Sequence, residues 1–133
     1  MEKITNQTEV NLSFPSNLII IPRLVVSGLL SNEKVTIEEI ENIKLIISEA
    51  VNLLILPDST TIISIKMNLA KIENQIKFKA HIQSQANQEI IKNLSKNGLT
   101  IYILNYLCSK FVLKENSQVI EITIEKDLKS ENL

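Results

Sequence analysis

The stretch IISEAVNLLIL, residues 46–56, places two polar side chains that could do chemistry inside an aliphatic run. Glu49 and Asn52 are three residues apart, so on a helix they lie on one face. A carboxylate held in a partly apolar pocket is desolvated, which raises its pKa toward the range of a general base. An amphipathic helix whose solvent-facing side includes Glu49 explains the same spacing, and the spacing alone leaves both interpretations open.

Few other residues could build a catalytic or metal site. The chain has one cysteine, Cys108, and one histidine, His81, which excludes an internal disulfide, a multi-cysteine zinc site and a histidine-rich metal cluster. We therefore expect no metal site. Cys108 lies among apolar residues and is expected to be a small buried hydrophobe. His81 alternates with Lys77 and Lys79 along a strand, on a face that we expect to be exposed to solvent.

Composition and charge are those of an ordinary globular chain. It has 133 residues, 44% of them hydrophobic, and a net charge of −1, so a single domain over residues 1–133 is expected. Its lysines are scattered, which argues against a nucleic-acid partner or a polybasic membrane surface. No apolar run approaches the ~20 residues of a membrane span, and the first residues lack an apolar signal core. We therefore expect a cytoplasmic protein.

The elements that position these residues follow from the apolar periodicity. Thr36 and Glu39 form a capping box at the start of the helix that carries Glu49, and Pro57 ends that helix after Leu56. The order β–α–α–β–β–α–α–β–β predicts an α+β fold, a two-layer sandwich with a mixed, mostly antiparallel sheet and helices on one face. The expected elements span residues 10–14, 18–30, 36–56, 61–69, 75–83, 88–94, 98–111, 110–113 and 118–126.

The ordered core is expected to cover about residues 9–125, with residues 127–133 frayed. Tyr102 and Tyr106 are one helical turn apart and are expected at the edge of the core. The helix that carries Glu49 should turn an apolar side to the sheet and a polar side to solvent. The polar side comprises Glu38, Glu41, Asn42, Glu49 and Asn52, interrupted by Leu45, Leu53 and Leu56.

Residues 14–55 carry a family resemblance. The pieces are Arg23 followed by LVVSG, the acidic helix start IEEIENIKL at 37–45, and SEA at 48–50. This stretch resembles the N-terminal half of the bacterial anti-sigma factor and serine-protein kinase family, part of the histidine-kinase-like (GHKL) ATPase superfamily. The strand order and the helix GLTIYILNYL at 98–107 extend the likeness over roughly residues 9–125. The resemblance implies a histidine-kinase-like ATPase fold.

The resemblance also assigns roles on the second helix. The family's catalytic base falls on Glu49. The asparagine that helps to hold Mg²⁺ one turn later falls on Leu53, and Asn52 is one residue too early. One residue turns a helix by about 100°, so Asn52 is a poor substitute as a cofactor ligand.

Two further family positions concern the nucleotide. The aspartate that binds adenine falls near Ile82, with Ser84 where the first glycine of that motif should be. The glycines beside the phosphates fall on Gly98, which matches, and on Thr100, which does not. The chain's only other glycine is Gly28, too few for a glycine-rich phosphate loop. Leucine and isoleucine offer no lone pairs to Mg²⁺ or adenine, so the site looks largely lost and Glu49 vestigial.

The leading hypothesis is therefore an anti-sigma-like regulator that binds a sigma factor or a STAS-domain anti-anti-sigma protein. The family resemblance also implies a homodimer. In this family the region of Arg23 contacts the partner. No cofactor is expected under this hypothesis. The alternative is an active serine-protein kinase or ATPase that binds Mg-ATP at an atypical site around Glu49. A third possibility is a small structural subunit that uses the fold as a scaffold.

Overall fold

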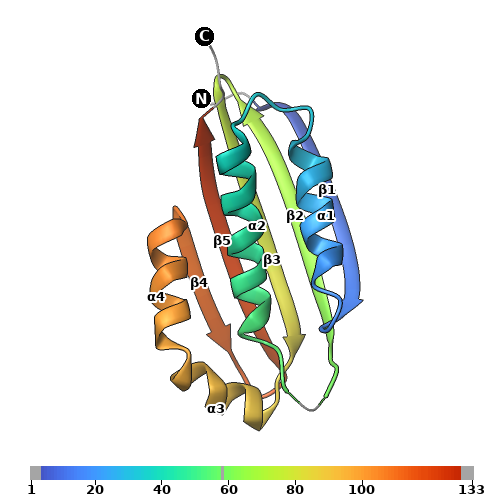
Figure 1. Ribbon diagram of the computed structural model, residues 1–133, viewed down its shortest axis with the longest axis vertical. Coiled ribbons are helices and arrows are strands. Elements are labelled where there is room, and N and C mark those ends of the chain that lie inside the picture. Colours follow the sequence, from blue (N-terminus) through green and yellow to red (C-terminus); the bar gives the residue numbers. More distant parts are fainter. Residues whose placement is uncertain (1–3, 58, 130–133) are drawn as a thin grey trace.

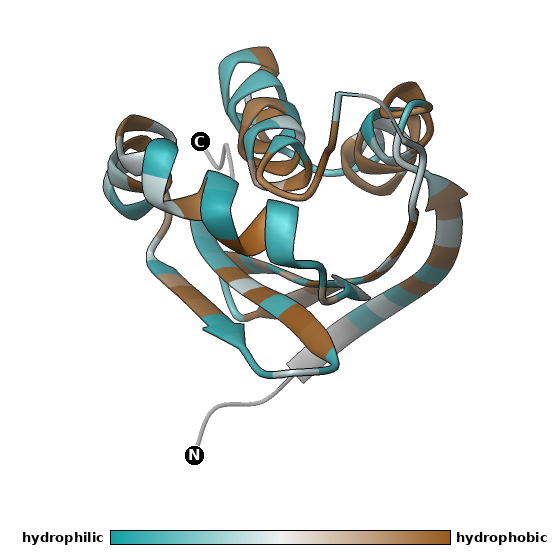
Figure 2. Cartoon of the chain, turned by 90° about the horizontal axis from the view of Figure 1, so that it is seen from below, coloured by the Kyte–Doolittle hydropathy of each residue, from teal (hydrophilic) through white to brown (hydrophobic). Residues whose placement is uncertain are grey.

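The computed structural model describes residues 4–57 and 59–129, and these form a sheet covered on one face by helices (Figures 1 and 2). The strands are β1 (Ile4–Pro15), β2 (Ile62–Ile72), β3 (Gln75–Gln85), β4 (Lys110–Glu115) and β5 (Val119–Lys129). The helices are α1 (Ile20–Leu30), α2 (Ile37–Asn52), α3 (Gln88–Lys96) and α4 (Gly98–Leu107). The predicted α+β class and element order are confirmed.

The sheet has the strand order β1-β2-β3-β5-β4, and every neighbouring pair is antiparallel. The prediction of a mixed sheet is therefore refined to an antiparallel one within the described residues. β2 and β3 form the predicted hairpin, with Ile72 opposite Gln75 across a two-residue loop. β5 lies between β3 and β4, so the last strand enters the sheet beside the central hairpin.

One face of the three inner strands is apolar because their residues alternate. Ile76, Phe78, Ala80 and Ile82 of β3 are all at most 2% exposed, as the alternation predicts. Their neighbours Lys77, Lys79 and His81 lie on the opposite face, where Lys79 is exposed and the other two are half-buried. β2 and β5 repeat this pattern, and their buried residues include Ile63, Ile65, Met67, Ile120, Ile122 and Ile124.

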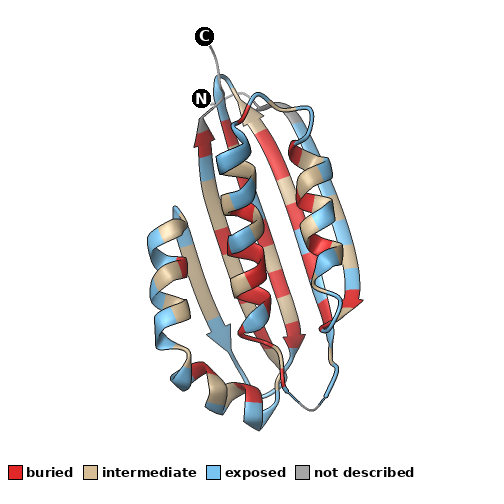
Figure 3. Cartoon of the chain, in the orientation of Figure 1, coloured by how far each residue is buried: buried red, intermediate tan, exposed pale blue. Residues whose placement is uncertain are grey.

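Helix α2 lies over the middle of this apolar face, between α1 and α4 (Figure 3). It begins at Thr36, whose hydroxyl oxygen accepts a hydrogen bond from the Glu39 backbone N–H at 3.1 Å. Its buried residues include Ile43, Ile46, Ile47 and Ser48. The buried surface is broader than a single stripe because α2 contacts α1 and α4 as well as the sheet.

The predicted end of α2 at Leu56 is wrong, because the helix ends at Asn52. The next residues tighten into turns in which Leu53 N–H donates to Ala50 C=O at 3.2 Å and Leu54 N–H donates to Val51 C=O at 2.9 Å. This tightening turns Leu53 and Leu54 into the core, at 1% and 0% exposure. The helix therefore ends at Asn52, five residues before Pro57, where Leu53 and Leu54 enter the core.

The flanking helices pack less completely than α2. In α1 the fully buried residues are Pro22, Val26 and Leu30, and in α4 only Leu104 is fully buried. Tyr102 and Tyr106 are 69% and 81% exposed, so their prediction as core-edge residues is wrong. They lie on the side of α4 that faces away from the sheet.

The strands extend beyond the core limits of 9 and 125 expected from sequence. β1 begins at Ile4, and β5 continues to Lys129, with Asp127 opposite Lys77 and Leu128 opposite Ile76. Leu128 is 1% exposed and β5 runs to Lys129, so the expectation of fraying from residue 127 is wrong at its first three positions. Residues 130–133 lie outside the described residues. Among the described helices, none is both long and apolar enough to cross a membrane.

The β2–β3 loop supplies a stability prediction. Glu73 has a φ of 56°, a left-handed conformation that costs an L-residue roughly 1–2 kcal/mol relative to glycine. Part of any gain is lost because glycine adds entropy to the unfolded chain. We expect Glu73→Gly to raise the free energy of unfolding by about 0.5–1 kcal/mol in urea denaturation. Glu73→Ala is the control, because it removes the carboxylate but keeps Cβ, and an equal gain there would contradict the backbone explanation.

Candidate functional site

The predicted site residues on α1 and α2 meet in a shallow depression between the two helices. Its volume is about 420 Å³, and α2 contributes one stripe at helical spacing. The lining residues are Ile19, Arg23, Glu41, Leu45, Ser48, Glu49 and Asn52, and we call this depression the α1–α2 groove. The structure therefore brings together three of the four residues singled out from sequence: Arg23, Glu49 and Asn52.

Glu49 is half-buried in this groove, and its surroundings are mainly polar. Leu45 precedes it by one turn and is 44% exposed, so the apolar wall on that side is open to solvent. Leu53, expected on the other side of Glu49, is turned into the core and leaves the polar side of the helix. The partly apolar pocket that would make Glu49 a general base is thus reduced to an open, polar depression.

Arg23 reaches the groove from α1, in the second turn of that helix. Its side chain is half-buried, and its Nε is buried without a hydrogen-bond partner within the described part of the chain. Buried donors of this kind normally find a partner, so the buried Nε is an exception within the wall of the groove. Arginine side chains suit directional contacts with carboxylates.

Exposed apolar side chains border the groove, and the sequence analysis did not identify them. Ile20 and Leu24 are 54% and 62% exposed and are one turn apart on α1. Neither residue lines the groove: Leu24 follows Arg23 and Ile20 follows Ile19 on α1, whereas Leu45 lines the groove from α2. Their exposure follows from α1 itself, since Pro22, Val26 and Leu30 take the buried side. A helical wheel with those three residues on its buried side places Ile20 and Leu24 on the exposed side.

The positions where the resemblance expects nucleotide ligands are filled by core residues. Leu53, Leu56 and Ile82 are 1%, 5% and 0% exposed. They belong to one apolar cluster with Ile90 and Leu94 of α3 and Leu104 of α4. Ser84, at the position of the first glycine, is 3% exposed at the end of β3. An apolar cluster of this kind provides no oxygen ligand for a cation and no acceptor for an adenine amino group.

Gly98 is not part of the α1–α2 groove. It is the first residue of α4, which lies on the opposite side of α2 from α1 (Figure 1). A Cβ at Gly98 would meet no atom within 4 Å, so close packing does not require glycine there. No positive φ occurs at this position. Thr100, which stands where the family has a second glycine, lies inside the first turn of α4.

The remaining titratable residues do not form a second catalytic cluster. His81 lies on the outer sheet face, where its Nδ1 is 3.3 Å from Thr123 Oγ1 and its Nε2 is 4.0 Å from Glu121 Oε1. Lys77 Nζ is 4.0 Å from Asp127 Oδ1 on the same face. Within residues 4–57 and 59–129, no group of three or more His, Cys, Asp or Glu side chains could hold a metal ion.

Cys108 caps the C-terminal end of α4 and packs at the edge of the core. Burial raises the pKa of its thiol to about 11, with the Lys126 ammonium acting weakly in the opposite direction. The thiolate is the reactive form, so this cysteine is nearly inert at neutral pH, as expected for a small hydrophobe.

Alkylation of Cys108 tests this environment. We expect the rate of reaction with iodoacetamide to rise with pH to a midpoint near 11 in the folded protein, and near 9 once the protein is unfolded in urea. The midpoint is higher in the folded protein because burial favours the neutral thiol until the pH exceeds the raised pKa. Equal midpoints in the folded and unfolded protein would contradict the burial of this thiol.

Comparison with known proteins adds no relative. No family model matches the sequence, and no curated protein matches it. The functional argument therefore depends on the groove itself: a polar depression with an unsatisfied arginine, bordered by exposed aliphatic side chains.

Proposed function

We propose that this chain is a degenerate member of the histidine-kinase-like ATPase superfamily that acts by protein–protein contact. Its partner would be a cytoplasmic sigma factor or a STAS-domain anti-anti-sigma protein, bound at the α1–α2 groove. The observation that carries the proposal is Arg23 and the exposed Leu45 in the groove, with Ile20 and Leu24 exposed next to it on α1. Interfaces of this kind place apolar anchors around a few directional polar groups, and arginine is enriched in them.

Apolar core residues at the positions expected to bind a nucleotide support a function by protein–protein contact. Mg-ATP needs an oxygen ligand for the cation and a polar partner for adenine, but Leu53 and Ile82 are core residues at those places. Opening that cluster for a nucleotide would expose buried aliphatic surface, at roughly 1.5–3 kcal/mol for each large side chain. Regulation would then depend on competition between partners for the groove.

Calorimetric titration with Mg-ATP separates this proposal from an active kinase. The polar lining of the groove, including Glu49, Ser48 and Asn52, is the observation that favours the enzyme. We expect no heat of binding with Mg-ATP up to millimolar concentration. Binding in the micromolar range that is lost in Glu49→Gln would overturn the proposal and establish the alternative.

Binding to the sigma factors and STAS proteins of the same organism, each purified and tested separately, examines the proposal directly. We expect one of them to bind, and Leu24→Asp or Arg23→Glu to weaken that binding at least tenfold, because an anchor or a charged donor is lost. Leu99→Asp is the matched control, since Leu99 is 74% exposed on α4, away from the groove. Absence of binding to every candidate, or equal loss with Leu99→Asp, would contradict this role for the groove.

A further inference from the structure

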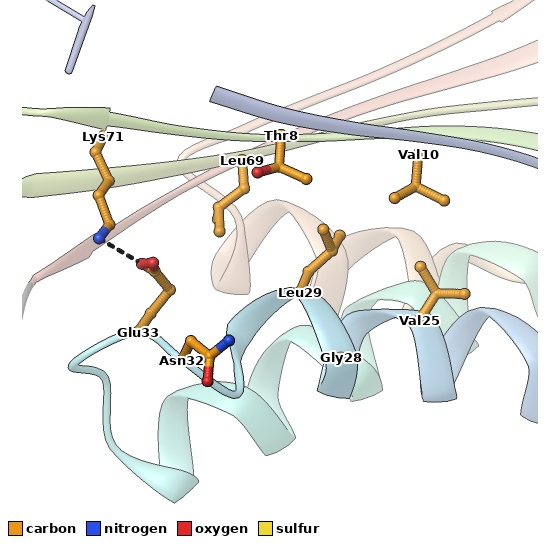
Figure 4. Close-up of a pocket in the computed structure, with 9 residues that line it drawn as sticks. All are labelled: Thr8, Val10, Val25, Gly28, Leu29, Asn32, Glu33, Leu69 and Lys71. Carbon is orange, nitrogen blue, oxygen red and sulfur yellow. Dashed lines mark ion pairs between the residues drawn. The ribbon is translucent and has the colours of Figure 1, made fainter. Parts of the chain in front are cut away.

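A second cavity lies on the other side of α1, between that helix and the edge strand β1. Its volume is about 520 Å³, and Figure 4 shows its lining side chains, which come from β1, β2, α1 and the turn after α1. They are Thr8, Val10, Val25, Gly28, Leu29, Asn32, Glu33, Leu69 and Lys71. None of them lines the α1–α2 groove, so the two sites share only the helix between them.

The cavity has an apolar side and a polar end. Val10 of β1 faces Val25 and Leu29 of α1, and Leu69 of β2 lies between them and the polar end (Figure 4). At that end Lys71 Nζ is 2.9 Å from Glu33 Oε2, and the Glu33 side chain is only 9% exposed. Asn32 places an amide next to Glu33 in the chain, and Thr8 lies beside Leu69, its partner across the β1–β2 pair (Figure 4).

Gly28 helps to keep the cavity open. Positions 25, 28, 29 and 32 form one helical stripe toward the cavity, and Gly28 is the only one without a side chain. Glycine inside a helix costs about 0.5–1 kcal/mol relative to alanine. Close packing does not require it here, because a Cβ at Gly28 would meet no atom within 4 Å. The residue thus leaves space rather than accommodating a neighbour.

The charge at the polar end restricts the head group of a ligand. Glu33 and Lys71 bring one charge of each sign to this end of the cavity. A zwitterion can place its ammonium near the Glu33 carboxylate and its carboxylate near the Lys71 ammonium, whereas an anionic or a cationic head can pair with only one of the two. Asn32 adds an amide for hydrogen bonds to such a head.

We propose that this cavity is a binding site for a small aliphatic α-amino acid, with its charged head at Glu33 and Lys71 and its side chain against Val10, Val25, Leu29 and Leu69. The lining has the usual character of a small-molecule site, a mainly apolar wall with a few polar groups at one end. The site is separate from the α1–α2 groove and does not depend on the function proposed for that groove.

Thermal unfolding with matched ligands tests the head group. We expect saturating L-leucine or L-norleucine to raise the unfolding midpoint by roughly 2–6 °C. Neither 4-methylpentanoate, which lacks the ammonium of leucine, nor 3-methylbutylamine, which lacks the carboxylate, should do so at the same concentration. No shift with either amino acid, or an equal shift with one of the singly charged analogues, would overturn the proposal.

Two variants locate the site. Gly28→Leu fills the cavity from α1 and favours the helix, so it should fold at least as stably as the parent and lose binding at least tenfold. The double variant Glu33→Gln, Lys71→Met removes both charges together, leaving no buried charge alone, and should also lose binding. Lys66→Met is the control, since Lys66 lies on β2 with an exposed, 3.9 Å contact to Glu9. Retained binding in Gly28→Leu would place the ligand elsewhere.

Methyl chemical shifts provide a readout that does not depend on stability. Titration with L-leucine should move the methyl resonances of Val10, Val25, Leu29 and Leu69. The methyl resonances of Leu99 and Leu104 on α4 should stay unchanged, because α4 lies on the far side of α2. Shifts confined to α4 would contradict the assignment of the cavity.

Discussion

Burial of one sheet face beneath α2 is the constraint on which the other features depend. The inner strands present alternating aliphatic residues, and α2 covers them with Ile43, Ile46, Ile47, Ala50 and Val51, all 0% exposed. Each large side chain buried in this way contributes roughly 1.5–3 kcal/mol, so the layer supplies most of the driving force for folding. α1 and α4 can pack more loosely because α2 already covers the centre of the sheet.

The same constraint explains why the candidate nucleotide positions are apolar. Leu53 and Leu56 would lie on the polar side of the helix if α2 continued, but the tightened turn after Asn52 inserts them into the core. Ile82 reaches that core from β3. Polar residues at these places would need hydrogen-bond partners that an aliphatic cluster does not provide, so an apolar core and a nucleotide site exclude each other here.

Much of the fold could be predicted from the sequence because its signals are local. The strand periodicity in residues 61–83 and the Thr36 cap each depend on neighbouring residues, and the structure confirms the elements that they predict. The end of α2, the exposure of Tyr102 and the strand at Asp127 and Leu128 were mispredicted because each depends on packing between distant segments. Local periodicity does not contain that information.

Prediction of the candidate site had the same limit, because residue types can be read locally but their exposure depends on packing. Glu49 and Asn52 were identified from residue type and spacing and Arg23 from the family resemblance, and the structure places all three around one groove. Ile20 and Leu24 were missed because the buried side of α1 is set by its contacts with the rest of the fold. Gly98, selected only by resemblance, lies at the start of another helix on the far side of α2.

The position of β5 between β3 and β4 has a consequence for the timing of folding. During synthesis β5 leaves the ribosome after every other described element, yet it pairs with β3 at the centre of the sheet. Until then β3 has one unpaired edge, and the aliphatic residues beneath α2 lack one of the strands that enclose them. The nascent chain therefore carries an exposed, aggregation-prone β3 edge from the synthesis of β3 until β5 has been made, and pairing of β3 with β5 follows translation of β5.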